Sequence, residues 1–311
     1  MSGRNILSRA GLAATFVLFA LQTGCLKQLI LEGQIASTRK ASAAVNTIGD
    51  WEVAEKIAMA GLGQMEGMRY LAPDNEDALF MLTRSWSSVA LGFMEDAMER
   101  AEDAEGSVSP DFDYHRRRAR AAYERAIWYG SQLLDAKHAG FKEAQLNAQT
   151  IKDYLAQFDD AETDAEILFW LGQAWLGRTG VSSEKGEVVG ELFVAVALLE
   201  RSIELDDTYM NGSAHVALGA YHARSTAELD DAKKHFDRAL ELSKGKSYLP
   251  EVQYAIRYLC LKGDKEGYVK TLEGVMAAGD AEPYQRLPNT IAKRKASRWL
   301  APNRMRDACG F

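Results

Sequence analysis

Proline and strand-like patterns are scarce in this chain. It has 6 prolines among 311 residues, and segments that alternate strictly between apolar and polar residues are nearly absent. Alanine, leucine, glutamate, lysine and arginine are common instead, and these side chains lose little rotamer freedom in a helix. The sequence therefore predicts an all-α protein.

Familiar catalytic motifs are also missing. The chain has no HExxH zinc motif, no GxSxG nucleophile motif and no phosphate-binding P-loop. A formal net charge of -7 argues against nucleic acid, because polyphosphate binding needs a basic surface that releases counterions. We therefore expect no enzyme activity, no cofactor and no nucleic-acid partner.

Residues 1–24 have the order of an export signal. Two arginines precede an apolar run from Gly11 to Leu21, and small residues then lead to Cys25. The run is shorter than the roughly 20 apolar residues that span a membrane, so we expect it to be removed. The residues before Cys25 resemble the bacterial lipobox, which implies lipidation of Cys25. A plain secretory signal with an incidental cysteine is the alternative.

This signal divides the chain and sets its compartment. We expect a lipoprotein signal peptide (1–24), a lipidated N-terminal segment (25–50) and a single helical-repeat domain (51–311). The protein would be periplasmic and lipid-anchored. Since Leu26 follows the cysteine in place of the Asp that retains enterobacterial lipoproteins, the inner leaflet of the outer membrane is favoured. Cys260 and Cys309 could pair in an oxidising compartment, but spacing alone leaves this open.

Apolar residues spaced three and four apart mark two long helices that we expect to pair. The first stripe comprises Leu79, Leu82, Trp86, Val89 and Phe93, and the second comprises Ala119, Ala122, Ala126, Tyr129 and Leu133. Four arginines at 116–118 and 120 would then form a solvated face opposite the acidic segment 94–105.

The second half shows a repeat of the tetratricopeptide (TPR) kind. Its first-helix positions are Leu168, Leu171, Gly172 and Trp175, and again His215, Leu218, Gly219 and His222. Its second-helix positions are Ala195, Leu199, Ser202 and Asp207, and again Ala232, Phe236 and Ala239. Each glycine would let the second helix approach. We predict stacked TPR-like hairpins, an α-solenoid, closed by a C-terminal capping helix in the segment "TIAKRKASRWL".

Large side chains are the candidate contacts for a partner or ligand, because stacked hairpins curve into a concave surface. The candidates are Trp86, Phe93, Trp170, Trp175, Tyr221 and His222. Trp175 is the one expected to be most exposed, because it precedes the long polar turn "GRTGVSSEKGEVVG". His215 and His222 share a helix face, but two histidines lack the third ligand of a usual metal site. We therefore expect them to serve packing or partner contact.

The order of these elements resembles the T component (TatT) of tripartite ATP-independent periplasmic (TRAP) transporter systems. The segments that carry the resemblance include "YLAPDNEDALFMLTRSWSSVALGFMEDAMERAE", "WLGQAW", "HFDRALELSKGKSY" and "NTIAKRKASRWL". The resemblance implies a lipid-anchored TPR-like protein that associates with the periplasmic substrate-binding subunit (P subunit) and assists uptake of an organic ligand, hydrophobic ligands included. It also implies that the protein forms homo-oligomers, with trimers as one such state, and it supplies no catalytic residues.

Two other functions remain as alternatives. A TPR lipoprotein of envelope or outer-membrane assembly would have the same helical pattern and anchor. A helical peptidoglycan-cleaving enzyme would need a catalytic Glu-Ser dipeptide, which the chain does not contain.

Overall fold

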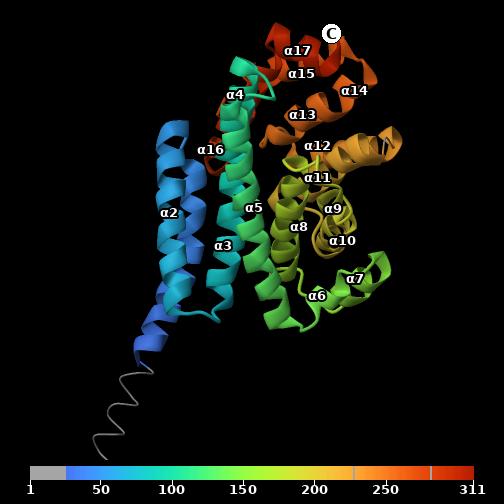
Figure 1. The fold of residues 1–311 in the computed structure, drawn as a ribbon. Coiled ribbons are helices and arrows are strands. Elements are labelled where there is room, and N and C mark those ends of the chain that lie inside the picture. Colours follow the sequence, from blue (N-terminus) through green and yellow to red (C-terminus); the bar gives the residue numbers. More distant parts are fainter. Residues whose placement is uncertain (1–25, 227, 281) are drawn as a thin grey trace, which may run out of the picture.

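The computed structural model describes residues 26–226, 228–280 and 282–311, and every regular element within them is a helix. This confirms the predicted all-α class. The expected export signal and Cys25 lie outside these residues. The helices run back and forth and pack side by side along most of the molecule (Figure 1).

The longest helices belong to the first half of the chain. Residues 26–41 are helical, and they are followed by η1 (Ser42–Thr47), α2 (Trp51–Leu71), α3 (Glu76–Val89), η2 (Ala90–Met94), α4 (Glu95–Glu105), α5 (Pro110–Lys137), α6 (Phe141–Ala144) and α7 (Ala148–Leu155). Because η2 is a π-helical turn, it joins α3 and α4 into one continuous helix. This helix packs lengthwise against α5, which confirms the predicted pair.

The second half consists of shorter helices. They are α8 (Asp164–Gly180), α9 (Gly186–Val189), α10 (Leu192–Leu205), η3 (Tyr209–Asn211), α11 (Ser213–Tyr221), η4 (His222–Thr226), α12 (Leu229–Ser243), α13 (Leu249–Gln253), η5 (Tyr254–Leu259), α14 (Cys260–Lys262), α15 (Lys265–Ala277), η6 (Pro283–Gln285), α16 (Arg286–Trp299) and α17 (Pro302–Cys309). α8 packs on α10 and α11 packs on α12, so both predicted hairpins form.

Glycines set how closely these hairpins close. A Cβ atom on Gly172 would lie 2.9 Å from Leu199 Cγ, and one on Gly219 would lie 3.0 Å from the ring of Phe236. Both distances are shorter than ordinary carbon contacts, so a larger residue at either position would push the neighbouring side chain away. The glycine role that the repeat pattern predicts is therefore confirmed in both hairpins.

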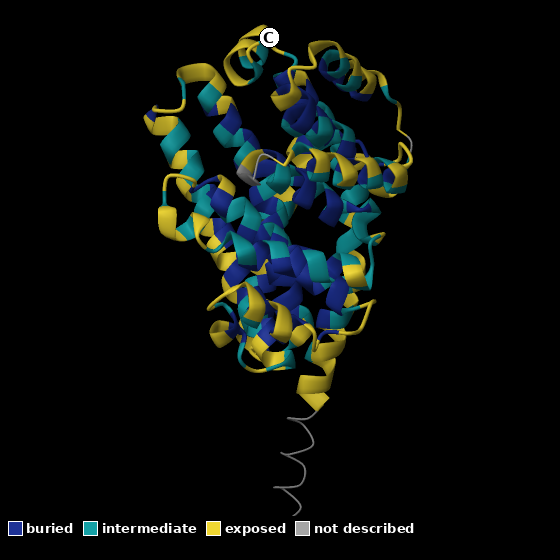
Figure 2. Ribbon diagram, turned by 90° about the vertical axis from the view of Figure 1, so that its right-hand side faces the viewer, coloured by how far each residue is buried: buried dark blue, intermediate teal, exposed yellow. Residues whose placement is uncertain are grey.

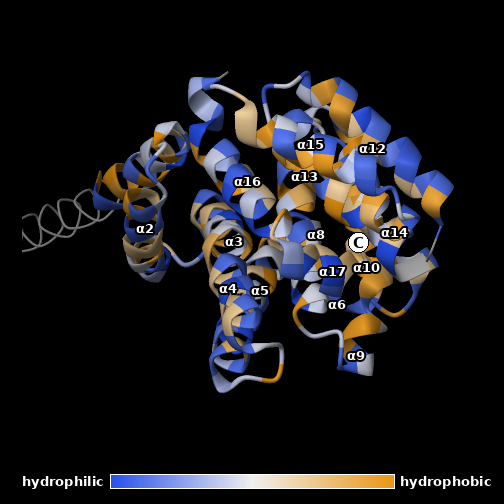
Figure 3. Ribbon diagram, turned by 90° about the horizontal axis from the view of Figure 1, so that it is seen from above, coloured by the Kyte–Doolittle hydropathy of each residue, from blue (hydrophilic) through white to orange (hydrophobic). Residues whose placement is uncertain are grey.

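Buried apolar side chains form two clusters, one extending from Ile35 to Leu218 with Leu287 added, and one extending from Ala223 to Trp299. Figure 2 shows buried positions between the helices and exposed positions along their outer faces and connecting turns. Seen from above, α2 stands at the edge of the assembly beside α3 (Figure 3).

The C-terminal helices return to the first half of the chain. On α16, Arg298 contacts Asp96 and Glu99 of α4 at 2.5 and 2.7 Å, and Lys295 contacts Glu99 at 2.8 Å. α17 adds Arg304, which contacts Asp103 at 2.8 Å. We call these residues the α4–α16 ion cluster. α16 thus does more than close the stack, because it ties the end of the chain to α4.

The arginines of α5 have other partners than predicted. Arg116 and Arg117 contact Asp113 on their own helix at 2.8 and 3.1 Å, and Arg120 contacts Glu184 at 2.6 Å. The expectation that they face the acidic segment 94–105 is wrong. That segment is occupied by the cations of α16 and α17, which lie far away in sequence.

Two contacts fix the ends of the described chain. Near the start, Arg39 pairs with Asp77 of α3 and Glu166 of α8, so the segment before residue 51 is docked on the helical domain. Near the end, Cys260 and Cys309 form a disulfide that joins α14 to α17, which answers the question that their spacing left open. Among the described residues, no helix combines the length and apolar character needed to cross a membrane.

Candidate functional site

Three of the six candidate residues lie in the core. Phe93, Trp170 and Trp175 are all buried, and the indole of Trp175 is only 3% exposed. The expectation that Trp175 is exposed in a groove is therefore wrong. Its Nε1 donates to Glu191 at 3.1 Å, and its ring packs edge-on against Phe141.

The cause lies in the turn that follows Trp175. α8 continues as far as Gly180, so the first four residues of the expected loop, 177–180, are helical. Val181 and Ser182 are then buried, and α9 forms before the chain enters α10. The turn folds back over Trp175 and covers it.

Trp86 lines an open groove. The groove has a volume of about 450 Å³ and is formed by α3, η2 and α5. We call it the Trp86 groove, and its lining residues are Trp86, Met94, Arg118, Ala121, Ala122, Arg125 and Trp128. Its walls are apolar side chains, and its polar groups are two guanidinium groups.

Hydrogen bonds fix the position of Trp86. The indole Nε1 donates to Glu66 at 2.9 Å, Arg125 Nε donates to the same carboxylate at 2.6 Å, and Tyr129 donates to its second oxygen. Burial alone would raise the pKa of Glu66, but the bonds from Arg125, Tyr129 and Trp86 outweigh it and lower that pKa. Burial and the Glu66 carboxylate raise the pKa of Tyr129 to about 12. The Glu66 carboxylate therefore stays ionised at neutral pH, and its three hydrogen bonds hold this side of the groove in place.

Two further groove residues are available to a partner. Trp128 is 55% exposed, which is unusual for an indole at a site with apolar neighbours. Arg118 has no ion pair with any residue of the described chain, although its guanidinium lies over the Tyr114 ring. An exposed indole beside an unpaired cation suits a ligand or protein surface that is both apolar and negatively charged.

Trp128 and Arg118 were not predicted, although the sequence contains a signal for them. Arg118, Ala121, Arg125 and Trp128 are spaced three, four and three apart, so they form a second stripe one position before the alanine stripe of the same helix. A stripe of cations and an indole beside a buried stripe marks the edge of a helix interface.

The remaining candidates, Tyr221 and His222, are half-buried at the end of α11. His222 stacks on His235 of α12 with ring centroids 5.5 Å apart, and His235 Nδ1 lies 2.9 Å from His215 Nδ1. Burial, with His215 and His222 close by, lowers the pKa of His235 to about 4. The structure thus confirms that His215 and His222 share a face, and it adds a third imidazole that sequence reasoning missed.

A second cavity of about 480 Å³ lies between the segment 248–259 and α15. Its walls include Tyr248, Tyr254 and Lys270, and Glu251 Oε2 is buried there without a hydrogen-bond partner among the described residues. Burial raises the pKa of Glu251. The cavity therefore offers mixed apolar and polar walls.

Comparison with known proteins identifies one family. Residues 48–305 match the family model described as the TRAP transporter T-component. The matched range begins just before α2 and ends within α17, so it includes both cavities and the three histidines. No curated protein matches the chain.

Proposed function

Because the chain belongs to the TRAP transporter T-component family, we propose that it holds the substrate-binding subunit of a TRAP system near the membrane. The family is an accessory component of these transporters and is not known as an enzyme, so a scaffold role agrees with the absence of catalytic motifs. The observation that carries the docking part is the Trp86 groove, where Trp128 and Arg118 meet solvent beside a fixed indole.

The proposal includes a lipid anchor on Cys25 and a periplasmic location. Leu26, Leu29 and Ile30 follow that cysteine, and all three are exposed, as apolar residues next to a membrane surface would be. The disulfide between Cys260 and Cys309 also supports export, since such bonds persist in oxidising compartments. We propose homo-oligomers in addition, and light scattering of the detergent-extracted protein would measure their size.

The organic ligand of the system is proposed to use the second cavity. Its tyrosines give apolar surface, while Lys270 and Glu251 could select polar groups of the ligand. Mass spectrometry of the detergent-extracted protein should find a small organic molecule bound to it. A protein that never carries such a molecule would restrict the function to scaffolding.

Docking is tested by measuring binding to the purified substrate-binding subunit. Trp128→Ala removes an exposed indole, and we expect it to weaken binding about tenfold or more, as a hot-spot residue would. Tyr284→Ala is the matched control, because Tyr284 is 60% exposed on η6 and does not line the groove. Lack of binding by the unaltered protein would refute the scaffold role. If the two substitutions weaken binding equally, the groove is not part of the contact with the substrate-binding subunit.

A further inference from the structure

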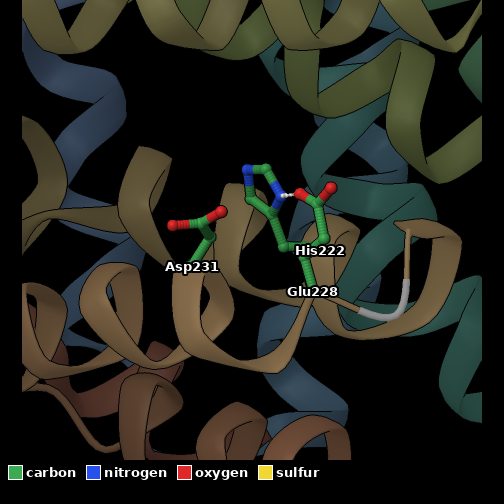
Figure 4. Close-up of side chains that lie close together, drawn as sticks. All are labelled: His222, Glu228 and Asp231. Carbon is green, nitrogen blue, oxygen red and sulfur yellow. Dashed lines mark hydrogen bonds and ion pairs between the residues drawn. The ribbon is translucent and has the colours of Figure 1, made fainter.

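A set of nitrogen and oxygen ligands lies where α11 gives way to α12. His222 Nδ1 lies 3.3 Å from Glu228 Oε2, and ligand atoms of His222, Glu228 and Asp231 all lie within 4.8 Å of one another. Figure 4 shows the two carboxylates flanking the His222 ring. We propose that His222, Glu228 and Asp231 bind a divalent transition-metal ion of the Zn²⁺ class. This site is independent of the proposed transporter docking.

The backbone explains how three ligands reach one point. His222 is the first residue of η4, a π-helical segment that ends α11, while Asp231 lies in the first turn of α12. Single π-helical turns recur at functional sites because they change the direction of side chains at one place in a helix. A bound ion would therefore link the two helices of this hairpin across their connecting turn.

The distances are close to those that a metal ion imposes. With bonds of about 2.1 Å, two ligands of a tetrahedral ion are about 3.4 Å apart, which is near the separation between His222 and Glu228. Since no separation in the set exceeds 4.8 Å, the widest has to close by up to about 1.4 Å on binding. Glu228 is exposed, and Asp231 is half-buried with its Oδ1 paired to the exposed Lys234 at 2.6 Å. Binding therefore needs rotation of both carboxylates and replacement of the Lys234 ammonium by the ion.

Two neighbouring histidines hold the His222 ring in place. His235 stacks on it with an interplanar angle of 10°, and His235 in turn contacts His215 through their Nδ1 atoms. This packing limits rotation of the His222 ring, and a ligand already held in one orientation loses less conformational freedom when it binds an ion. His215 and His235 are positioning residues in this proposal.

The donor set selects the class of ion. One imidazole nitrogen and two carboxylate oxygens suit Zn²⁺ and similar divalent ions, whereas Mg²⁺ and Ca²⁺ prefer oxygen ligands alone. Three protein ligands leave a fourth position for water or for a ligand from another molecule.

The test measures Zn²⁺ binding to the full chain, extracted in detergent, stripped of metal and carrying no histidine tag. Titration against a chromophoric chelator should show one equivalent of Zn²⁺. His222→Ala and Asp231→Asn should each lower the affinity at least about tenfold, because each removes a ligand. Zn²⁺ should also raise the unfolding temperature of the unaltered protein, because it binds only the folded state, and this increase should be lost in both variants.

His115→Ala is the matched control. His115 Nε2 lies 3.7 Å from Asp111 Oδ1, so it also forms a histidine–carboxylate pair on a helix. It belongs to no cluster of three or more potential ligands in the described part of the chain. This variant should keep the full Zn²⁺ affinity. Less than one equivalent in the unaltered protein would overturn the proposal, and so would an equal loss in His115→Ala and His222→Ala. Circular dichroism of each metal-free variant checks that the fold is intact.

Discussion

Arg298 is the residue of the α4–α16 ion cluster whose loss should cost most stability. Its side chain is 10% exposed and contacts Asp96, Glu99 and Asp103 at 2.5, 2.7 and 3.3 Å. In Arg298→Met the apolar stem remains while the charge is removed, so the buried carboxylates lose their central partner. Arg298→Met therefore isolates the ionic contribution from the packing contribution.

The expected loss is about 3 kcal/mol. Removing one partner of a buried ion pair typically costs about 3–5 kcal/mol. The lower value applies here because Glu99 keeps Lys295 at 2.8 Å and Asp96 keeps Arg294 at 3.1 Å. For a chain of this size, about 3 kcal/mol corresponds to a decrease of roughly 6–12 °C in the unfolding temperature.

Thermal and urea unfolding, followed by circular dichroism, measure this loss. Arg306→Met is the control, because Arg306 and Asp307 form a pair in which both side chains are about two-thirds exposed. Exposed pairs contribute little, so the control should stay within about 0.5 kcal/mol of the unaltered protein. If Arg298→Met is no more destabilising than Arg306→Met, the argument that the cluster anchors the C-terminal helices is refuted.

Three further predictions concern Glu99, the packing of glycines, and the disulfide. Burial alone would raise the pKa of Glu99, but Lys295 and Arg298 outweigh it and lower that pKa from 4.5 to about 2. Because the folded-state pKa is depressed, the Glu99 carboxylate contributes about 3 kcal/mol to the free energy of unfolding above about pH 4.5, and this contribution is lost as the pH falls toward 2. The difference in unfolding free energy between the unaltered protein and Glu99→Gln should therefore fall by more than half between about pH 7 and 3. Gly177→Ala should destabilise by about 1–3 kcal/mol in urea unfolding, since a Cβ there would overlap the Tyr123 ring. Gly63→Ala, on an exposed part of α2 with no atom within 4 Å, should instead stabilise by about 0.5–1 kcal/mol, and equal effects at the two glycines would contradict the packing argument. Reduction of the disulfide, which closes a 49-residue separation, should lower stability by up to about 4 kcal/mol, and a protein that unfolds identically with and without reductant would show that the bond constrains nothing.

Much of the fold could be predicted from local patterns. The stripe from Leu79 to Phe93 specified a long helix, and Gly172 and Gly219 specified two close helix pairs, because both signals depend on neighbours within one or two turns. The π-helical turn η2 was not predicted, since the apolar spacing on either side of it remains three and four. Helix boundaries in the segment after Trp175 were also missed, because its glycines suggested a loop where the helix continues.

The candidate sites were predicted less well than the fold. A helical stripe shows which residues are apolar, but it does not show which of them the next helix covers. Trp86 and Trp175 look alike in sequence, yet only Trp86 retains exposure beside a groove. His222 was singled out for packing or partner contact, and Glu228 and Asp231 were not grouped with it, because only the turn between the two helices brings them close.

The α4–α16 ion cluster shows that a long-range contact can also leave a local signal. The apolar stripe of α3 continues past Phe93 with the same spacing of three, reaching Asp96, and Asp103 follows at seven. A stripe that faces the interior and then becomes acidic needs buried cations, because a buried carboxylate without a partner costs several kcal/mol. Arg294 and Arg298 are spaced by four on a helix that is otherwise amphipathic, so the sequence offers them as partners, although they were not proposed. The arginines of α5 were chosen because they are near in sequence, but Arg116 and Arg120 pair with Asp113 and Glu184 instead. Matching the buried stripe of one helix to the charged stripe of another would therefore have predicted that the chain's end returns to α4.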